Sequence, residues 1–323
     1  MKIITIGGSG FVGTRFIELF NESDVDVLNL DIQQSEKFAE ITTIADVLDE
    51  QKITNEIKGA DCIVLLAAQH RDDVSPVSLY YDVNVQGLKN VLSSMEKNNC
   101  KRLLFFSSVA VYGLDKDNPD ESFTPEPFNH YGKSKWEAEQ VLQQWYKTHS
   151  DWNINIIRPS VIFGEKNRGN VYNLFSQVAS GKFLMIGSGK NKKSMAYVGN
   201  VASFAKYLLE NFTNGYNLFN YTDKPDFSMN KLVTLIYNAL NKKASSIRIP
   251  YYIGLLGGYC LDFLAIVLRK KLPISSIRVK KFCATTSINA DKAHNSGFKA
   301  PFKLEEGLEK TLSHEFPNRN EIN

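Results

Sequence analysis

The chain has 323 residues, a formal net charge of +3 and a hydrophobic content of 43%, so it can bury a core and is neither disordered nor fibrous. It has no lysine- and arginine-rich block that would bind nucleic acid, and its mild basic excess suits anionic small molecules or an anionic membrane surface. The four cysteines lie too far apart for a zinc site or a disulfide framework, so we expect no metal. A strand-like run directly after Met1 leaves no room for a signal peptide, and we expect a cytoplasmic protein.

Short apolar runs alternate with longer amphipathic segments in the first half of the chain. The predicted strands cover 2–6, 25–30, 62–67, 102–107 and 154–158, and the predicted helices cover 11–20, 75–97 and 129–148. This alternation requires crossover connections and hence a parallel sheet with helices on both faces. We therefore predict an α/β fold, a Rossmann-type doubly wound parallel sheet with a smaller C-terminal substrate lobe.

The regular alternation loosens after Arg158 and Pro159. Glycines and basic residues gather at 164–193, and a helix-rich stretch begins near Asp226, after the strand-like residues 216–221. We expect the Rossmann domain to comprise residues 1–165 with 194–222 returning to it, and the substrate lobe to comprise 166–193 and 223–323.

A glycine-rich turn follows the first predicted strand and opens the first helix. Gly7, Gly10 and Gly13 allow a tight turn, close approach to a pyrophosphate, and N–H groups at a helix N-terminus. Asp31 ends the second predicted strand, where a carboxylate would accept hydrogen bonds from a ribose diol and repel a 2′-phosphate. The pattern indicates NAD rather than NADP, and the alternative is a structural turn with a capping acid.

Tyr131 and Lys135 are four residues apart on a predicted helix and share one of its faces. A lysine ammonium beneath a phenol is expected to lower the pKa of Tyr131 from about 10, so that Tyr131 serves as a base near neutral pH. Ser108 follows an apolar strand at the carboxyl edge of the sheet, where its hydroxyl would bind a substrate oxygen. Taken singly, the tyrosine and lysine could equally be a surface pair on a helix.

Together and in this order, these groups resemble the extended short-chain dehydrogenase/reductases, the NAD-dependent epimerase/dehydratase family. The resemblance covers nearly the whole chain, through Gly7–Gly13, Asp31, Asp46-Val47, Leu66–Ala68, Asn84–Gly87, Ser107–Gly113, Tyr131–Lys135 and Arg158-Pro159. It implies that Ser108, Tyr131 and Lys135 are catalytic. The cofactor-binding residues that it implies for NAD are Gly7, Gly10, Phe11, Val12, Gly13, Asp31, Asp46, Val47, Ala67, Ala68, Asn84, Ser107, Tyr131, Lys135 and Arg158.

Dehydratases of this family usually carry Asp-Glu directly after the serine or threonine, whereas this chain has Val109-Ala110 there. The resemblance then implies reversible oxidation of a secondary alcohol, with Tyr131 taking the hydroxyl proton while hydride leaves the carbon for NAD. Return of the hydride to the other face would be epimerisation, and the cofactor would stay bound.

More particular stretches are similar to bacterial O-antigen epimerases that interconvert GlcNAc and GalNAc on undecaprenyl diphosphate. These stretches are His70–Pro76, Phe128–Tyr131, Asn167–Asn173, Lys193–Asn200, Leu255–Cys260 and Arg278–Thr286. The likeness implies a lipid-linked diphospho-sugar substrate, bound by His70, Ser108, Asn170, Lys193, Tyr197 and Arg278, with Arg168, Lys190 and Lys192 as further cations for the diphosphate. The alternatives left open are a 4-epimerase of UDP-N-acetylglucosamine and a non-catalytic NAD-binding scaffold.

Residues 249–268 are apolar all round a helix and carry a single charge, Asp262, before the basic residues Arg269, Lys270 and Lys271. Pro250, several glycines and the central Asp262 argue against a spanning helix. A core or dimer helix and peripheral membrane contact through 249–271 are the two interpretations left open. We also expect a homodimer through the segments 75–97 and 129–148, as in similar family members.

Overall fold

Seven parallel strands form one sheet in the order β10-β6-β5-β4-β1-β2-β3. The computed structural model describes residues 1–20, 24–71, 74–243, 247–268, 270, 272 and 275–317. The strands of this sheet are β1 (Lys2–Ile6), β2 (Asp26–Asp31), β3 (Thr42–Ile44), β4 (Cys62–Leu65), β5 (Arg102–Phe106), β6 (Asn153–Pro159) and β10 (Tyr216–Tyr221). The predicted doubly wound α/β fold is confirmed, and its order reverses between β1 and β4, where such sheets bind ligands.

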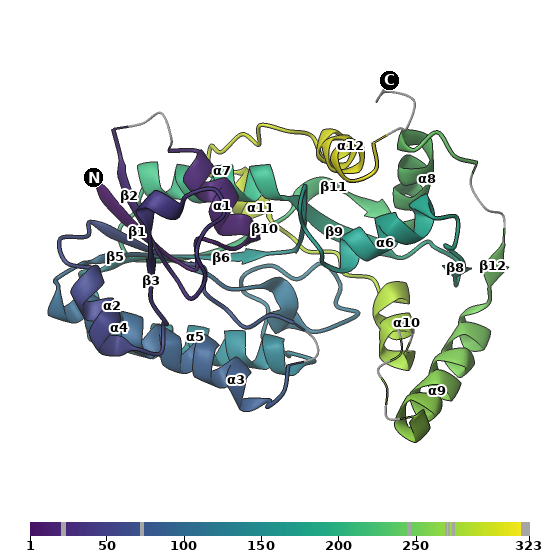
Figure 1. Cartoon of the computed structure of the whole chain (residues 1–323), viewed down its shortest axis with the longest axis horizontal. Helices are drawn as coiled ribbons and strands as arrows, with labels where there is room; N and C mark the ends of the chain where they lie inside the picture. The colour runs from purple at the N-terminus through teal and green to yellow at the C-terminus, as the bar shows by residue number, and fades with distance from the viewer. Residues whose placement is uncertain are drawn as a thin grey trace.

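Helices cover both faces of this sheet (Figure 1). On one face lie α2 (Glu50–Glu56), α4 (Gly87–Lys97) and α5 (His130–Tyr146), and on the other α1 (Phe11–Glu18), α7 (Val198–Glu210) and α11 (Asp291–His294). Successive strand residues point to opposite faces, so Ile63 joins one core and Val64 the other. This two-sided burial explains why central strands such as β4 and β5 are almost continuously apolar in sequence.

The segment predicted as one helix over 75–97 consists of α3 (Ser78–Tyr81), the π-helix η2 (Asp82–Gln86) and α4. The short 3-10 helices η1 (Ala39–Ile41) and η3 (Val109–Tyr112) lie in connections of the large sheet. Of these, η3 follows the end of β5 closely and has Ser108 as its N-cap.

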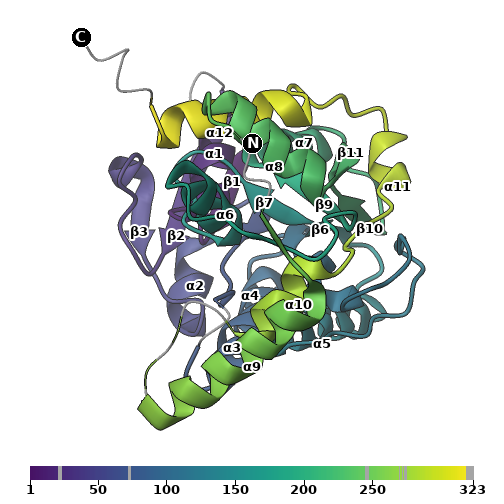
Figure 2. The ribbon, with the colours of Figure 1, turned by 90° about the vertical axis from the view of Figure 1, so that its right-hand side faces the viewer.

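The second lobe is built around a three-stranded sheet and three helices that share one core (Figure 2). Its strands are β7 (Val161–Phe163), β9 (Lys192–Tyr197) and β11 (Asp223–Ser228), and its core helices are α6 (Asn170–Ala179), α8 (Met229–Ala239) and α12 (Leu304–Glu315). A two-stranded sheet of β8 (Met185–Ile186) and β12 (Arg248–Ile249) leads into α9 (Tyr251–Leu268), which packs against α10 (Ser276–Cys283).

Helix α9 is the predicted apolar segment, and it projects from the body of the protein (Figures 1 and 2). Of its 18 residues, all of them described, Gly258 alone is buried. The interpretation of this segment as a core helix is therefore wrong. Within the described ranges, α9 is the one helix whose length and composition would allow it to cross a membrane.

Candidate active site

The glycine turn follows β1 at the carboxyl edge of the sheet and passes close to the end of β4. Gly7 has φ +90°, and a Cβ atom there would lie 2.4 Å from the backbone nitrogen of Ala67. A Cβ atom on Gly13 would lie 2.5 Å from the Cα atom of Gly8, so α1 can start this close to the turn only without a side chain. Gly10 is the N-cap of α1, with no side-chain cap and no acidic residue in the first turn.

Two residues near the end of β2 fix this turn. The buried Asn29 side chain accepts a hydrogen bond from the N–H of Gly8 at 2.9 Å. The Asp31 carboxylate accepts the N–H of Ser9 at 2.9 Å and that of Gln33 at 3.0 Å. Asn29 was not predicted as a functional residue, although a polar residue inside the apolar run of β2 was the available signal.

The other residues predicted on the cofactor side take different positions. Phe11, Val12, Ala67 and Ala68 are half-buried around the turn and the end of β4. Asp46 is exposed, with Oδ1 accepting the N–H of Leu48 at 2.9 Å, whereas Val47 is buried. Asn84 is buried and binds Gln69 and Ser134, which ties the loop after β4 to α5.

Tyr131 and Ser108 approach each other from two different elements. Asn129 is the N-cap of α5 and accepts the N–H of Gly132 at 2.9 Å, so the helix begins just before Tyr131. Ser108 is the N-cap of η3 and accepts the N–H of Ala110 at 3.1 Å. The Ser108 hydroxyl acts on Tyr131 in the direction that lowers its pKa, so two of the three predicted catalytic residues lie near each other.

Lys135 lies one turn further along α5, buried beneath the end of β5. Its Nζ donates a hydrogen bond to the carbonyl of Phe106 at 2.8 Å and lies 4.9 Å from the ring centroid of Phe105. Burial lowers the pKa of Lys135 to about 7, although the charge of Glu139 acts in the opposite direction. The ammonium and amine forms of Lys135 are therefore both accessible near neutral pH.

The expectation of a lowered pKa for Tyr131 is wrong for the protein alone. Burial raises the pKa of Tyr131, and the hydrogen bond from Ser108 offsets only part of that effect. The Nζ of Lys135 donates its hydrogen bond to the carbonyl of Phe106 rather than to the Tyr131 hydroxyl.

A buried ion pair lies beneath the predicted catalytic residues. The guanidinium of Arg158 binds the Glu139 carboxylate through two nitrogens, with Nε 2.9 Å from Oε1, and both side chains are about 2% exposed. Ser107 also donates to Glu139, and Arg158 donates to the Tyr112 hydroxyl at 2.6 Å. The side chains of Ser107 and Arg158 thus bind other protein groups. Glu139, four residues after Lys135, supports both of them and was not predicted from the sequence.

Two predicted substrate residues, Tyr197 and Lys193, do not meet near Tyr131. Tyr197 is buried, and its hydroxyl donates to Glu165 at 3.0 Å. Lys193 donates to the carbonyls of Lys281 and Ala284 at 2.8 and 2.6 Å, so it fixes the C-terminus of α10. Burial lowers the pKa of Lys193 to about 8.

The remaining predicted substrate residues are exposed. His70 lies on the loop after β4, and Asn170 is the first residue of α6. Arg278 lies on α10, with its backbone N–H bonded to Ser275 Oγ. Arg168 forms an ion pair with Glu315 at 2.7 Å, which reduces its availability to a diphosphate.

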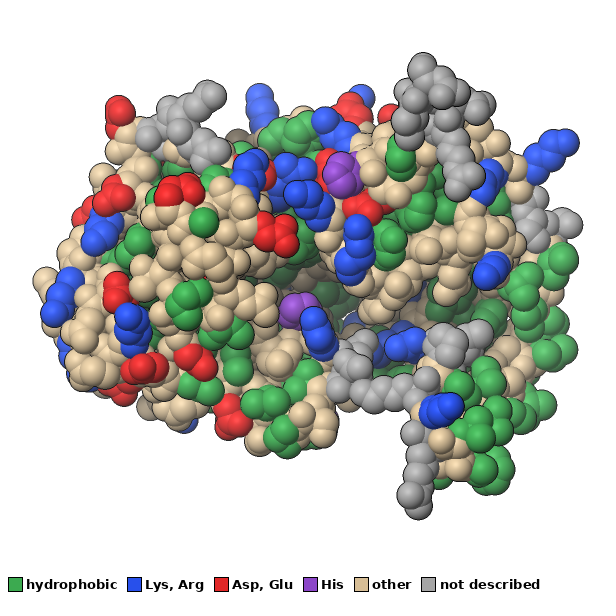
Figure 3. Space-filling model, in the orientation of Figure 1, with side chains coloured by type: hydrophobic (Ala, Val, Ile, Leu, Met, Phe, Trp, Pro, Cys, Tyr) green, Lys and Arg blue, Asp and Glu red, His purple; other side chains and the backbone are tan. Residues whose placement is uncertain are grey.

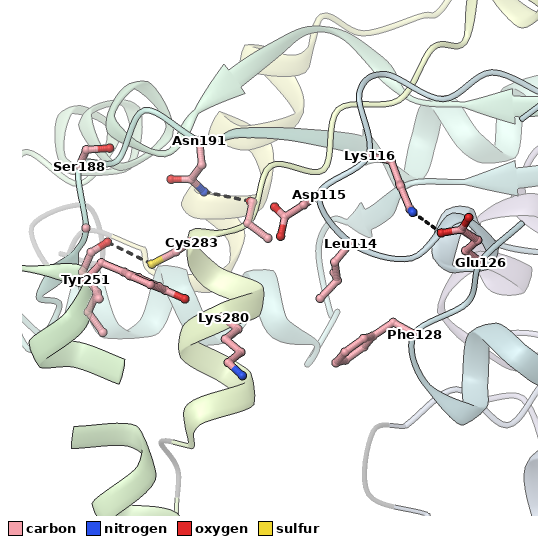
Figure 4. A pocket seen from close by; sticks show the side chains of 13 residues that line it. Leu114, Asp115, Lys116, Glu126, Phe128, Ser188, Asn191, Tyr251, Lys280 and Cys283 are labelled. Carbon is pink, nitrogen blue, oxygen red and sulfur yellow. Dashed lines mark hydrogen bonds and ion pairs between the residues drawn. The ribbon is translucent and has the colours of Figure 1, made fainter. Parts of the chain in front are cut away.

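A pocket of about 660 Å³ lies between the two lobes, next to the catalytic segments (Figure 4). One wall comes from Leu114, Lys116 and Phe128, which flank the segments of Ser108 and Tyr131 in sequence. The other wall comes from β8, α9 and α10, and it includes Tyr251, Lys280 and Cys283. The volume is in the range of small-molecule sites, and Lys280 was not among the predicted basic residues.

The residues at the end of β1 fit a dinucleotide. Its pyrophosphate would lie at the uncapped N-terminus of α1, where Gly10 has no protein atom within 3.4 Å of a Cβ position. Asp31, already oriented by two backbone N–H groups, would bind the adenosine ribose. Bound there, NAD would supply a hydride acceptor on the side of Tyr131 and Ser108.

Comparison with known proteins agrees with this arrangement. Residues 3–221 match the NAD dependent epimerase/dehydratase family. The chain is 58% identical over 316 residues to N-acetyl-alpha-D-glucosaminyl-diphospho-ditrans,octacis-undecaprenol 4-epimerase of Escherichia coli O157:H7, covering 98% of this chain and 95% of that protein.

Solved structures show the same fold. The UDP-glucose 4-epimerase of Thermotoga maritima superposes with a TM-score of 0.77 at 19% identity, covering 98% of each chain. The UDP-N-acetylglucosamine 4-epimerase of Methanobrevibacter ruminantium M1 gives 0.76 at 20% identity, covering 97% of each chain. The chain therefore belongs to the NAD-dependent epimerase/dehydratase family, and NAD is its cofactor.

Proposed function

We propose that the protein is a 4-epimerase that interconverts GlcNAc and GalNAc on undecaprenyl diphosphate. The observation that carries the proposal is the 58% identity to the Escherichia coli undecaprenol-linked epimerase, because it extends over 98% of the chain and so includes the second lobe. The site supplies the groups that the reaction needs at Ser108, Tyr131 and Lys135.

The chemistry follows from these side chains. Tyr131 accepts the proton of the C4 hydroxyl as the C4–H bond breaks, and NAD bound at the glycine turn would supply the reversible hydride acceptor. Ser108 donates a hydrogen bond to the C4 oxygen. Lys135, when it is protonated, supplies positive charge from its buried position on α5. Return of the hydride to the opposite face of the C4 ketone, with the proton from Tyr131, gives the epimer.

The residues that directly follow Ser108 do not supply the acid and base that dehydration requires. Val109 and Ala110 begin η3 directly after Ser108, and that helix has no acidic residue in its first turn. An acid and a base beside the hydroxyl would be needed to eliminate water.

We place this activity in the synthesis of a surface polysaccharide such as an O-antigen, at the cytoplasmic side of the membrane, in a homodimer. The dimer would use α4 and α5, which lie together on one face of the large sheet (Figure 1). Residues 1–165 with 194–222 would bind NAD, and 166–193 with 223–323 would bind the substrate. These bounds depart from the fold at two places: β7 and β9 belong to the sheet of the second lobe, and α11 packs on the large sheet. Light scattering after gel filtration would test the dimer.

The test of the function offers purified protein GlcNAc-diphospho-undecaprenol and UDP-GlcNAc in parallel, without added cofactor. The proposal predicts a GalNAc product from the lipid-linked sugar. Turnover of UDP-GlcNAc alone would show a nucleotide-sugar epimerase instead. Absence of turnover with both, in protein shown to contain NAD, would indicate a non-catalytic NAD-binding protein.

A further inference from the structure

Helix α9 presents a broad apolar side to solvent (Figure 3). Tyr252 is 81% exposed, Ile266 75%, Phe263 69% and Leu256 65%. At 3.6 residues per turn, the exposed apolar residues of α9 cover roughly half of its circumference. An exposed apolar patch of this kind on a folded protein marks a surface that contacts a membrane, a protein or a ligand.

Two of the glycines and the aspartate that argue against a spanning helix lie on the opposite side of α9, which faces the protein. A Cβ atom on Gly254 would lie 2.5 Å from the Ile186 side chain, and one on Gly258 would lie 2.8 Å from the backbone of Ser276. Asp262 accepts the N–H of Ser276 at 3.1 Å and so binds the first turn of α10. The glycines and the acid therefore seat α9 on β8 and α10, and the outward side is left uniformly apolar.

The charge around this patch is strongly asymmetric. Among the described residues from 247 to 283, the acidic residue is Asp262, which is bonded to α10, while the basic ones are Arg248, Lys270, Arg278, Lys280 and Lys281. Lys280 lies 5.5 Å from the ring centroid of Tyr259, and its hydrogen bond with that tyrosine raises the pKa of Lys280. Arg269 and Lys271 of the predicted basic run lie outside the described residues.

We propose that α9 docks the protein on an anionic lipid bilayer, with its outward side among the acyl chains and the basic residues at the headgroups. Anionic lipids attract basic residues that border an apolar helix face. A second copy of this chain is disfavoured as the partner of the apolar side of α9. A twofold contact through α9 would bring the basic residues around the two copies of the helix together, and like charges repel. Spanning is disfavoured because α10 packs along α9 and binds Asp262.

Docking of α9 on the bilayer would also position the lipid-linked substrate at the pocket. This part of the proposal rests on the proposed function. Tyr251 begins α9, and Lys280 and Cys283 belong to α10, yet all three line the pocket between the lobes (Figure 4). A lipid diphosphate anchored in the bilayer below α9 would have its phosphates at the level of Lys280. The sugar would then extend towards the segments that carry Ser108 and Tyr131.

The direct test is sedimentation with vesicles of phosphatidylglycerol and phosphatidylethanolamine, compared with vesicles of phosphatidylcholine. Binding should be stronger to the anionic vesicles and should fall with added salt. The double variant Phe263→Asn with Ile266→Asn should bind at least roughly tenfold more weakly. Ile44→Asn is the matched control, since Ile44 is 52% exposed on β3 at the far end of the sheet, and it should bind as the parent does.

Three results of the binding experiments would overturn the docking proposal. One is equal vesicle binding by the parent and the double variant, with both folded by circular dichroism. Another is a parent that does not bind vesicles but forms an oligomer that the double variant disrupts. The third is a parent that alkaline carbonate fails to extract from membranes, which would show a spanning helix.

Activity separates this proposal from the proposed function. The double variant should lose turnover of GlcNAc-diphospho-undecaprenol in vesicles and keep turnover of a short-chain, water-soluble prenyl-diphospho-GlcNAc. A parent that binds vesicles but converts neither substrate would refute the epimerase and leave docking supported. A double variant as active as the parent on the vesicle-borne substrate would refute docking.

Discussion

Ser108, the N-cap of η3, lies near Tyr131 in the first turn of α5, and its hydroxyl acts on the phenol in the direction that lowers its pKa. This places the hydroxyl that would bind the C4 oxygen beside the phenol that would take its proton. Ser108 accepts the N–H of Ala110, and Asn129 caps the helix just before Tyr131.

Replacing Tyr131 with Phe should remove the titrating oxygen and leave the ring to pack. We expect kcat to fall by about 10³-fold, with NAD content and thermal stability close to the parent. Tyr146→Phe is a control on the same helix, since its hydroxyl donates only to the Ser150 carbonyl at 3.1 Å. Activity of Tyr131→Phe within a few-fold of the parent would exclude Tyr131 as the base.

The Glu139 and Arg158 pair should behave as one buried unit. Glu139→Gln leaves the Arg158 charge without its partner and should lower the free energy of unfolding by about 3 kcal/mol in urea titrations. The double variant Glu139→Met with Arg158→Met should recover much of that loss, because no buried charge is left. Equal losses in the single and double variants would show that the pair is not coupled.

Lys135 should make stability depend on pH. Its pKa is lowered from 10.5 to about 7 in the folded protein, so folding opposes its protonation. This penalty is complete below pH 7 and disappears as the pH rises towards 10.5. Lys135→Met should therefore be more stable than the parent by a few kcal/mol at pH 6.

The stability difference should shrink steadily from pH 7 to pH 10, measured by urea unfolding of both proteins. A constant difference between Lys135→Met and the parent across this range would contradict the lowered pKa. Activity is not the readout here, because Lys135 is also a catalytic candidate.

Asp31 should determine which dinucleotide binds. Asp31→Asn removes the charge that repels a 2′-phosphate and weakens the bonds to the N–H groups of Ser9 and Gln33. We expect NAD affinity to fall at least roughly tenfold and NADP binding to become measurable by calorimetry. Asp26→Asn, at the other end of β2, is the control and should bind NAD as the parent does.

The sequence predicted the parts of this protein that depend on local pattern. Apolar runs such as that of β4 are buried on both sides, and Gly7 and Gly13 are required by contacts less than 3 Å away. The strand β3 and the helix α2 were missed because β3 has three residues and α2 is mostly polar. Short or polar elements carry little periodicity.

Long-range partners could not be predicted. Lys193 has the composition of a phosphate ligand, yet its Nζ binds carbonyls near the end of α10, far away in sequence. The sequence likewise left open whether α9 is buried, because burial depends on which elements reach it. Glu139 became visible only through its bond to Arg158 on β6.

The most direct test of reversible oxidation at C4 uses GlcNAc-diphospho-undecaprenol with deuterium at C4 and protein without added NAD. If the C4 hydride is transferred to bound NAD and returned to the other face of C4, mass spectrometry will find GalNAc that retains the deuterium. Product that has exchanged C4 deuterium for solvent hydrogen, or turnover that depends on added reduced cofactor, would contradict hydride return from bound NAD.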